Sequence, residues 1–244
     1  VWQSAAKGKA AVHCVIVGFG LDQNRAKTIF EYEDGKGAPT AIGAQNINAY
    51  LVDAPNIFIS SRSSSIALSP KMKFGNQPID GGNLILDSKE KDEFLKHKSE
   101  TKSLIRKYIG AYEFINNVER YCLWLKDVSP AEIKKFPLVL DRIDKVKKFR
   151  LSSDRKATQD LAESPTTFAF ISHEENNYIV VPSVSSERRK YVPIGFMSAE
   201  VITSNLCLIV PNATLYDFAI MTSIMHNAWM RTTCGRLKSD YRYS

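Results

Sequence analysis

The last ten residues of the chain, GRLKSDYRYS, combine the side-chain types that contact nucleic acid. Lys238, Asp240 and Arg242 alternate along this segment and are interleaved with tyrosine. A lysine can donate to O6 and N7 of guanine, and an aspartate can accept a hydrogen bond from N4 of the paired cytosine. An acid beside phosphates weakens electrostatic attraction, so Asp240 needs a role of its own. Reading a G·C pair is one such role, and a salt bridge to Lys238 or Arg242 is the simpler alternative, which residue types alone do not exclude.

A second basic segment, ERRKY, contains Arg188, Arg189 and Lys190. It lies between two expected strands, so we expect an exposed loop whose cations contact DNA phosphates. Most charged loops are simply solvated, and that alternative stays open. Arg62 and Arg236 are the other two cations that we expect at the DNA backbone.

Other arrangements that could support catalysis or cofactor binding fail on spacing. The Gly18-Phe19-Gly20 segment follows an expected strand, but position 23 is Gln and a strand rather than a helix is expected next. A phosphate-binding loop requires the N-terminus of a helix there. Ser88 and Lys91 match a Ser-x-x-Lys pattern, which helix capping explains better. No Gly-x-Ser-x-Gly nucleophile elbow occurs.

The histidines and cysteines do not form a metal-binding pattern. None of the four histidines is spaced from another His or Cys as metal ligands require, and no Cys-x-x-Cys occurs. The four cysteines are far apart in mostly apolar segments, which favours reduced thiols and a cytoplasmic location over disulfides. We therefore expect no metal and no catalytic residue in this chain.

Size and charge fit a globular protein that binds a polyanion. The 244 residues allow one large domain or two small ones, and 44% hydrophobic with 24% charged residues is an ordinary globular composition. The net charge of +7 is a moderate excess of cations. No apolar stretch of about 18 residues predicts a membrane span. The opening residues, VWQS, resemble neither a signal peptide nor a translation start, and suggest a cut inside a longer protein.

Periodicity and capping residues predict the helices. Asp87 and Glu90 form a capping box, and Ser129 precedes a proline in the first turn of another helix. Apolar residues recur every three positions after Pro137, opposite a basic face. The expected main helices cover residues 87–109, 137–150 and 213–230.

Runs of β-branched and aromatic residues between turn signals predict the strands. These cover residues 10–18, 28–32, 119–126, 166–172, 178–182, 191–196 and 206–210, and residues 47–52 and 56–60 are expected to be extended as well. A turn is expected at residues 33–37 and an irregular region at residues 61–83. The expected fold class is α/β (mixed α+β), with mixed sheets and several helices.

Several segments resemble the MmeI-like single-chain restriction–modification enzymes, which join nuclease, methyltransferase and target-recognition parts. They are AAKGKAAVHCVIVGF (5–19), NINAYLVDAPNIFISSRSSSI (46–66), FGNQPIDGGNLIL (74–86), ERYCLWLKD (119–127), VPSVSSERRKYVPIGF (181–196) and GRLKSDYRYS (235–244). The last segment and the ERRKY loop are the most specific of these.

The resemblance implies a division of the chain and a set of roles. Residues 1–60 would be the C-terminal strands of a methyltransferase domain, and residues 61–244 a DNA target-recognition domain. The family's Gly-rich S-adenosylmethionine loop and its Asn-Pro-Pro-Tyr/Phe motif do not occur here. We therefore expect no catalysis and no cofactor in this fragment, with S-adenosylmethionine bound elsewhere in the parent protein. The expected partners are double-stranded DNA and the missing methyltransferase domain, not a membrane.

The resemblance also assigns base-reading positions. Two specificity positions of the family fall on Lys238 and Asp240, which would read one base pair next to the methylated adenine, and a third falls on Arg242. The expected function is sequence-specific recognition of duplex DNA that positions an adenine for N6-methylation. Two alternatives remain: a complete S-adenosylmethionine-dependent methyltransferase with unrecognised motifs, and a protein-interaction domain that does not bind DNA.

Overall fold

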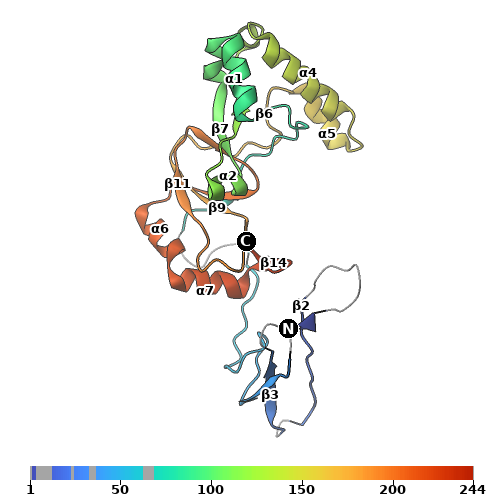
Figure 1. Cartoon of the computed structure of the whole chain (residues 1–244), viewed down its shortest axis with the longest axis vertical. Coiled ribbons are helices and arrows are strands. Elements are labelled where there is room, and N and C mark those ends of the chain that lie inside the picture. The colour runs from blue at the N-terminus through green and yellow to red at the C-terminus, as the bar shows by residue number, and fades with distance from the viewer. Residues whose placement is uncertain (1, 4–12, 23–24, 33–36, 63–68, 244) are drawn as a thin grey trace. The chain divides into compact units, whose positions relative to one another are not determined.

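The structure, a computed structural model, describes residues 2–3, 13–22, 25–32, 37–62 and 69–243 (Figure 1). The chain divides into two compact units, Val1–Ile66 and Ala67–Ser244, which we describe one at a time. The expected fold class is confirmed, because helices accompany several small sheets, one of which contains both parallel and antiparallel pairs. Within the described part of the chain, no helix has the length and apolarity needed to cross a membrane.

Unit 1 contains two antiparallel strand pairs. Its strands are β1 (Trp2–Gln3), β2 (His13–Cys14), β3 (Lys27–Glu31) and β4 (Thr40–Ala44), paired β1 with β2 and β3 with β4. The strand expected at 28–32 is therefore confirmed, one residue earlier. Of the turn expected at 33–37, residues 33–36 lie outside the described residues.

Two sequence expectations in unit 1 need correction. Of the strand expected at 10–18, residues 10–12 lie outside the described residues and His13–Cys14 form β2, but Val15–Val17 form no strand and their side chains are 54–86% exposed. Their apolar character indicates burial, and the described residues of unit 1 do not cover them. Residues 47–52 form a turn rather than an extended segment, because Asn48 accepts from Leu51 N–H at 2.9 Å and donates its own N–H to Val52 at 3.1 Å.

The first sheet of unit 2 has the strand order β12–β7–β8–β6. Its strands are β6 (Ile85–Leu86), β7 (Ile105–Ile109), β8 (Tyr121–Leu123) and β12 (Val201–Thr203), and β12 is parallel to β7. Helices α1 (Ser88–His97), α3 (Pro130–Ile133) and α4 (Pro137–Leu151) belong to the same layer of the fold. Phe94 of α1, Leu123 of β8 and Val146 of α4 share one hydrophobic core.

The second sheet of unit 2 is antiparallel, with the order β11–β9–β13–β5. Its strands are β5 (Lys73–Phe74), β9 (Tyr178–Pro182), β11 (Gly195–Met197) and β13 (Cys207–Pro211). Its helices are α2 (Ala111–Asn116), α6 (Leu215–Thr222) and α7 (Ile224–Thr233). Ile179, Leu208 and Met230 lie in one buried cluster, which fixes α7 against the sheet.

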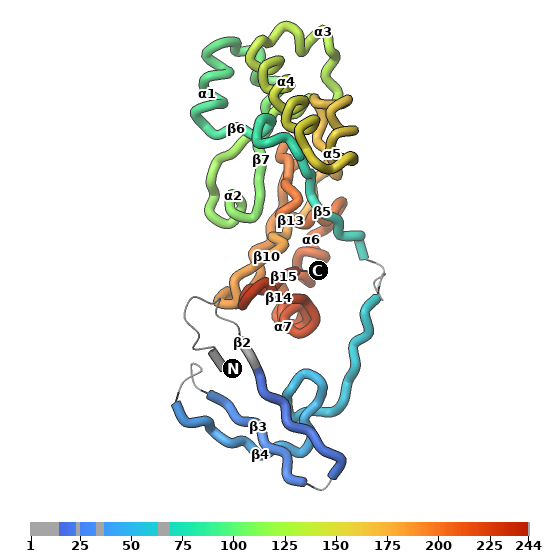
Figure 2. The backbone as a smooth tube through the Cα atoms, turned by 90° about the vertical axis from the view of Figure 1, so that its right-hand side faces the viewer, coloured from blue at the N-terminus to red at the C-terminus, as the bar shows by residue number. Residues whose placement is uncertain are grey.

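Smaller elements complete unit 2. They are a 3-10 helix at Ser99–Leu104, α5 (Lys156–Asp160), a second 3-10 helix at Leu161–Glu163, and strands β10 (Val184–Ser185), β14 (Gly235–Leu237) and β15 (Asp240–Arg242). The last three strands form a separate sheet in the order β10–β15–β14. Figure 2 shows this sheet beside α7.

Helix starts with side-chain caps are confirmed, whereas several other element bounds are wrong. Asp87 and Glu90 make the expected reciprocal capping box, and Ser129 Oγ accepts from Glu132 N–H at 3.2 Å. The helix expected over 87–109 ends at His97, and its last five residues form β7 instead. The strand expected at 166–172 is reduced to a single bridge between Gln77 and Phe170.

The helix expected over 213–230 is two helices. Ser223 lies between α6 and α7 in an extended conformation, with φ −67° and ψ 154°. Its Oγ accepts from His226 N–H at 3.1 Å, so Ser223 caps the second helix. The strand expected at 191–196 likewise shifts to Gly195–Met197, and residues 191–194 form no regular element.

One arginine joins α4 to the loops beneath it. The side chain of Arg150 is completely buried although it is cationic. Its guanidinium donates to five backbone carbonyls at 2.8–2.9 Å, those of Pro78, Ile79, Leu161, Ser164 and Thr167. A buried charge is tolerated only when such donors are satisfied. These five bonds therefore fix α4 against the loops that contain the acceptor carbonyls.

Candidate nucleic-acid interface

The C-terminal segment folds as an exposed hairpin. β14 and β15 pair antiparallel with Leu237 opposite Asp240, which leaves Lys238 and Ser239 as a two-residue turn. Lys238 takes the left-handed conformation, with φ 58°, as two-residue hairpin turns require at their first central position. A lysine there accepts backbone strain that glycine or asparagine would avoid.

Strand alternation separates the side chains of the hairpin into two faces. Asp240 and Arg242 are two residues apart on β15 and therefore share one face. Tyr241 projects to the other face, where it lies opposite Arg236 of β14 and packs against the core. The guanidinium of Arg236 lies 3.8 Å from the centre of the Tyr241 ring and donates to the Ser239 carbonyl at 2.8 Å. These contacts stiffen the hairpin at its turn.

The alternative of an internal salt bridge at Asp240 is not what the structure shows. Within the described residues, Asp240 forms no ion pair with Lys238 or Arg242. Its Oδ1 accepts instead from the backbone N–H of Glu187 at 3.3 Å. This contact joins the hairpin to the ERRKY loop and leaves the second carboxylate oxygen without a described partner.

Hydrogen bonds hold the backbone of the ERRKY loop, while the side chains of Arg188 and Lys190 are exposed and that of Arg189 is half-buried. Arg189 N–H donates to Ser186 O at 3.1 Å, which closes a turn after β10. The side chain of Arg188 is exposed, and no described residue bonds to it. Lys190 is exposed as well, with its Nζ 5.7 Å from the centre of the Tyr191 ring. The loop therefore presents cations to solvent while its main chain is fixed.

Helix α7 positions both the loop and the hairpin through its polar side chains. Arg231 donates to the carbonyl of Arg189 at 2.9 Å and also to that of Lys190. Buried Asn227 accepts from Val192 N–H at 3.0 Å, which fixes the end of the loop. These residues do not stand out in sequence, because an Asn and an Arg four positions apart on a helix are ordinarily read as an exposed face.

The chain end is tied to the same helix. His226 Nε2 and the Tyr243 hydroxyl are 2.6 Å apart, and Tyr243 N–H donates to the Ser183 carbonyl at 2.9 Å. Burial raises the pKa of Tyr243 and lowers the pKa of His226. Both shifts favour the neutral forms, in which the hydroxyl can donate to the imidazole. This pair fixes β15 directly after Arg242.

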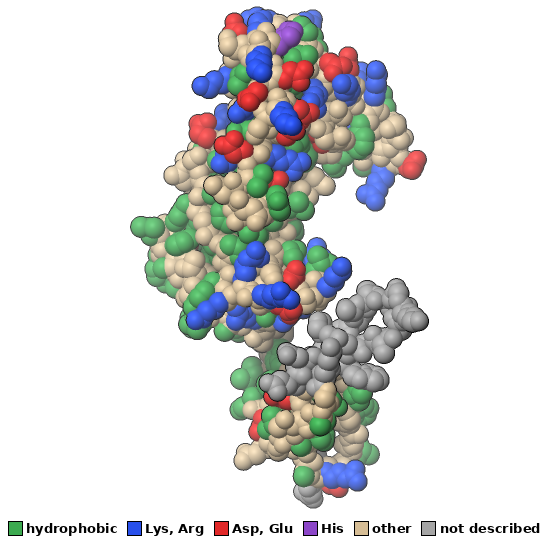
Figure 3. All heavy atoms as spheres, in the orientation of Figure 1, with side chains coloured by type: hydrophobic (Ala, Val, Ile, Leu, Met, Phe, Trp, Pro, Cys, Tyr) green, Lys and Arg blue, Asp and Glu red, His purple; other side chains and the backbone are tan. Residues whose placement is uncertain are grey.

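Positive charge is concentrated at these elements. We define the hairpin cluster as the charged residues of positions 184–191 and 231–242, which comprise seven cations and two acids. It holds five of the seven net positive charges of the chain. In Figure 3, Lys and Arg side chains gather over this end of unit 2, with few acids among them. Clustering of this kind raises the local concentration of a polyanion.

The predicted site residues fall into two groups. The structure brings Arg188, Arg189, Lys190 and the hairpin residues Arg236, Lys238, Asp240 and Arg242 together in unit 2. Arg62 lies in unit 1, where it is exposed and belongs to no helix or strand. Its expected phosphate contact therefore stays a prediction.

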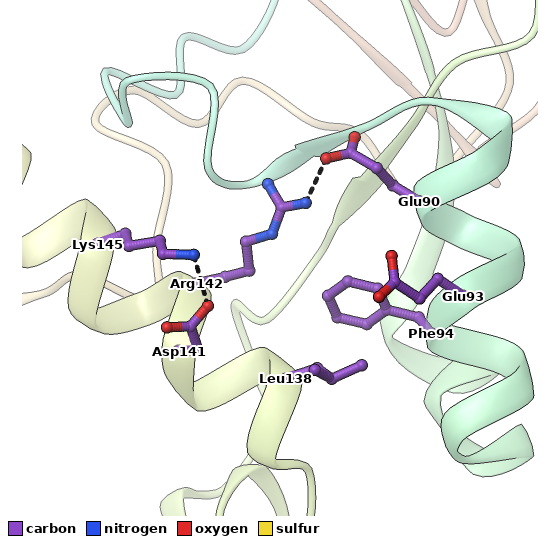
Figure 4. Close-up of a pocket in the computed structure, with 7 residues that line it drawn as sticks. All are labelled: Glu90, Glu93, Phe94, Leu138, Asp141, Arg142 and Lys145. Atoms are coloured by element: carbon purple, nitrogen blue, oxygen red, sulfur yellow. Dashed lines mark hydrogen bonds and ion pairs between the residues drawn. The ribbon is translucent and has the colours of Figure 1, made fainter.

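The groove between α1 and α4 does not resemble a catalytic centre (Figure 4). Four of its charged side chains form two ion pairs, Arg142 with Glu90, and Lys145 with Asp141 at 2.7 Å. Across the described residues, no group of three or more His, Cys, Asp or Glu side chains could hold a metal ion.

The described residues around Gly18 and Gly20 form no recognisable cradle for S-adenosylmethionine. Gly18 and Gly20 lie in an exposed segment without regular structure, and the next described element is the strand β3. A nucleotide-type cofactor needs backbone N–H groups at a helix start in that position. The described residues of this segment do not fit the cofactor.

Replacing Arg231 should make the ERRKY loop more mobile. We expect Arg231→Gln to speed hydrogen exchange at the Arg189 and Val192 amides by about tenfold, because two charge-assisted bonds to the loop carbonyls are lost. The comparison is Arg188→Gln, whose side chain has no described partner and should leave exchange unchanged. Equal exchange rates in the two variants would contradict a clamping role for Arg231.

Comparison with known proteins identifies the class. Residues 53–244 match the family described as MmeI, target recognition domain. This match covers most of the chain, which therefore belongs to the MmeI target recognition domain family.

Two relatives match over the whole chain. DNA methyltransferase A of Bacillus subtilis (strain 168) is 44% identical over 245 residues, covering 100% of this chain and 27% of that protein. The solved structure of the Type IIL restriction–modification enzyme MmeI in complex with DNA is 44% identical, with a TM-score of 0.89, and covers 100% of this chain and 32% of that one. The chain thus spans about a third or less of the length of these relatives.

Proposed function

We propose that unit 2 recognises a specific sequence in duplex DNA through the hairpin cluster. The observation that supports this best is the β14–β15 hairpin itself, in a chain of the target recognition family. Lys238 and Arg242 are exposed and unpaired among the described residues, on either side of a half-buried Asp240. β10 pairs with Tyr241 and Arg242 only, so the tip of the hairpin, from Leu237 to Asp240, is two strands wide. A two-stranded ribbon fits the major groove of B-DNA.

The chemistry of the hairpin suits one G·C pair. Lys238 at the turn can donate to O6 and N7 of guanine, and the free oxygen of Asp240 can accept from N4 of the paired cytosine. Arg242 shares the face of Asp240 and can reach a neighbouring base. The bond from Glu187 N–H holds the Asp240 carboxylate in place before DNA binds, which lowers the entropic cost of recognition.

Phosphate contacts are proposed for the surrounding cations. Arg188, Arg189 and Lys190 lie in the clamped loop, and Arg236 keeps N–H donors beyond its bond to Ser239. Arg62 is proposed from unit 1 by its exposure and charge. Such contacts set orientation and affinity but do not distinguish bases.

We further propose that this recognition serves N6-methylation of an adenine by the rest of a longer polypeptide. The name of the Bacillus relative supports the methyltransferase. The strand rather than helix among the described residues after Gly18 and Gly20 supports an S-adenosylmethionine site in another part of that polypeptide. The exposed apolar side chains of Val15, Ile16, Phe19 and Phe58 in unit 1 support the proposal that residues 1–60 pack into a methyltransferase domain. The bound adenine would be flipped out of the duplex to reach that domain.

Salt dependence of binding tests the phosphate contacts. We expect Arg188→Ala in the native polypeptide to reduce the slope of log affinity against log salt by about 1, because one phosphate contact is lost. The matched control is Lys148→Ala, which removes an exposed cation from α4 outside the hairpin cluster. Equal slopes for both variants would remove Arg188 from the interface, and absence of duplex binding at low salt would sink the proposed function.

A further inference from the structure

The outward face of the β14–β15 hairpin includes an exposed apolar side chain. Residues paired across antiparallel strands point to the same face, so Leu237, opposite Asp240, shares the face of Asp240 and Arg242. The side chain of Leu237 is 53% exposed. Tyr241, on the other face, packs against the buried cluster that contains Met230 of α7. Packing in the core of unit 2 therefore does not account for a leucine at this position.

Gly235 lies on the same outward face, opposite Arg242. A Cβ atom added at Gly235 would meet no other group within 4 Å among the described residues. Its backbone is also outside the left-handed region, unlike that of Gly81 or Gly82. Neither packing nor backbone conformation therefore requires glycine at this position. A glycine that the fold does not need is typical of a place where the backbone closely approaches a ligand.

The chemistry of Leu237 suits one group on the base edges. Among the edges exposed in the major groove, thymine alone presents a methyl group, at C5. Leucine has no hydrogen-bond donor or acceptor, so it cannot read the other base edges or bind a phosphate. Directly opposite residues of a hairpin have Cβ atoms about 4.5–5.5 Å apart, and successive base pairs are about 3.4 Å apart along the duplex. Leu237 can therefore reach the base pair next to the pair that Asp240 contacts.

We propose that Leu237 is a further specificity-determining residue, which contacts the C5 methyl group of a thymine in the base pair next to the G·C pair read by Lys238 and Asp240. The inference rests on the proposed function, because the contact requires the hairpin to enter the major groove. The proposed adenine substrate supplies at least one thymine, on the opposite strand. Gly235 leaves the same face free of a side chain, so that the hairpin can approach the base edges closely.

Removing the methyl group from the DNA and the side chain from the protein tests the contact. Each thymine of the recognised sequence is replaced in turn by uracil, and competition binding is measured with the native polypeptide and with Leu237→Ala. We expect uracil at one thymine beside the G·C pair to weaken binding by the native polypeptide about fourfold, because the burial of one methyl group is lost. Leu237→Ala should bind the thymine and uracil duplexes equally. The matched control is Leu215→Ala, which truncates an exposed leucine of α6 and should keep the preference for thymine.

A second variant keeps the test independent of the stability of the hairpin. Leu237→Gln retains most of the side-chain length but places a polar group at the methyl, so it should also lose the preference for thymine. A preference that persists in both variants would assign the methyl contact to another residue. Equal binding of the native polypeptide to every uracil duplex would overturn the contact but leave G·C reading by Lys238 and Asp240 intact. Absence of any sequence preference would instead overturn the proposed function, and the role of Leu237 with it.

Discussion

Replacing Lys238 with alanine is expected to weaken discrimination at one base pair of the recognised sequence by about 1–3 kcal/mol, or roughly 5- to 150-fold. The reason is local. Lys238 is exposed at the hairpin turn without a described partner, so its loss removes donors to guanine and disturbs no internal contact. The measurement is competition binding by the native polypeptide against duplexes that each carry one substituted base pair.

The matched control is Lys190→Ala, which removes an exposed cation from the loop rather than from the hairpin. A phosphate contact carries no sequence information, so this variant should weaken binding to all duplexes by a similar factor. If Lys238→Ala weakens binding to all duplexes equally, without a change in preference at any single base pair, Lys238 contacts a phosphate and does not read a base.

Replacing Arg150 with methionine is expected to cost about 3–5 kcal/mol of unfolding free energy. Methionine keeps much of the volume but donates nothing, so five buried carbonyls lose their partner. Arg150→Lys should recover little of this loss, because an ammonium group lacks the planar fork that reaches several carbonyls at once. Urea unfolding of the 244-residue chain, followed by circular dichroism, measures the change.

Lys148→Met is the control for this prediction. It makes the same kind of substitution two residues earlier on α4, at an exposed position. Its expected effect is within about 0.5 kcal/mol, as for most surface substitutions. A loss for Arg150→Met that does not exceed the loss for Lys148→Met would contradict the structural role of Arg150.

The sequence was sufficient to predict a helix start where a capping side chain bonds to the backbone of the same helix. The Asp87–Glu90 capping box and the Ser129 cap each depend on residues three positions apart, and both helices start where expected. Ser223 is also a local cap, but the helices on both sides of it are apolar. The apolar periodicity therefore continues across Ser223 and predicts one helix where the structure has two, α6 and α7.

Elements that depend on distant partners could not be predicted in this way. Ile105–Ile109 follows a helix of similar polarity and becomes a strand because it pairs with Val201–Thr203, far along the chain. Arg150 belongs to a helix with many cations, and only the fold shows that it is buried among five carbonyls.

The candidate site shows a similar division. Residue types made base reading by Lys238 and Asp240 possible, and the family resemblance added Arg242. The hairpin geometry that arranges these three residues could not be predicted from the sequence. The supports were missed, because Arg231, Asn227 and His226 bond to segments distant in sequence. Their role is to fix where the proposed reading residues lie.

Reciprocal exchange of the two proposed reading residues tests the central claim most directly. Lys238→Glu combined with Asp240→Arg in the native polypeptide reverses donor and acceptor on the hairpin, and the methylated sites of DNA exposed to it can then be mapped. We predict methylation at a sequence in which one G·C pair is inverted to C·G and all other positions are kept. Methylation of the original sequence by the exchanged protein would contradict recognition through Lys238 and Asp240.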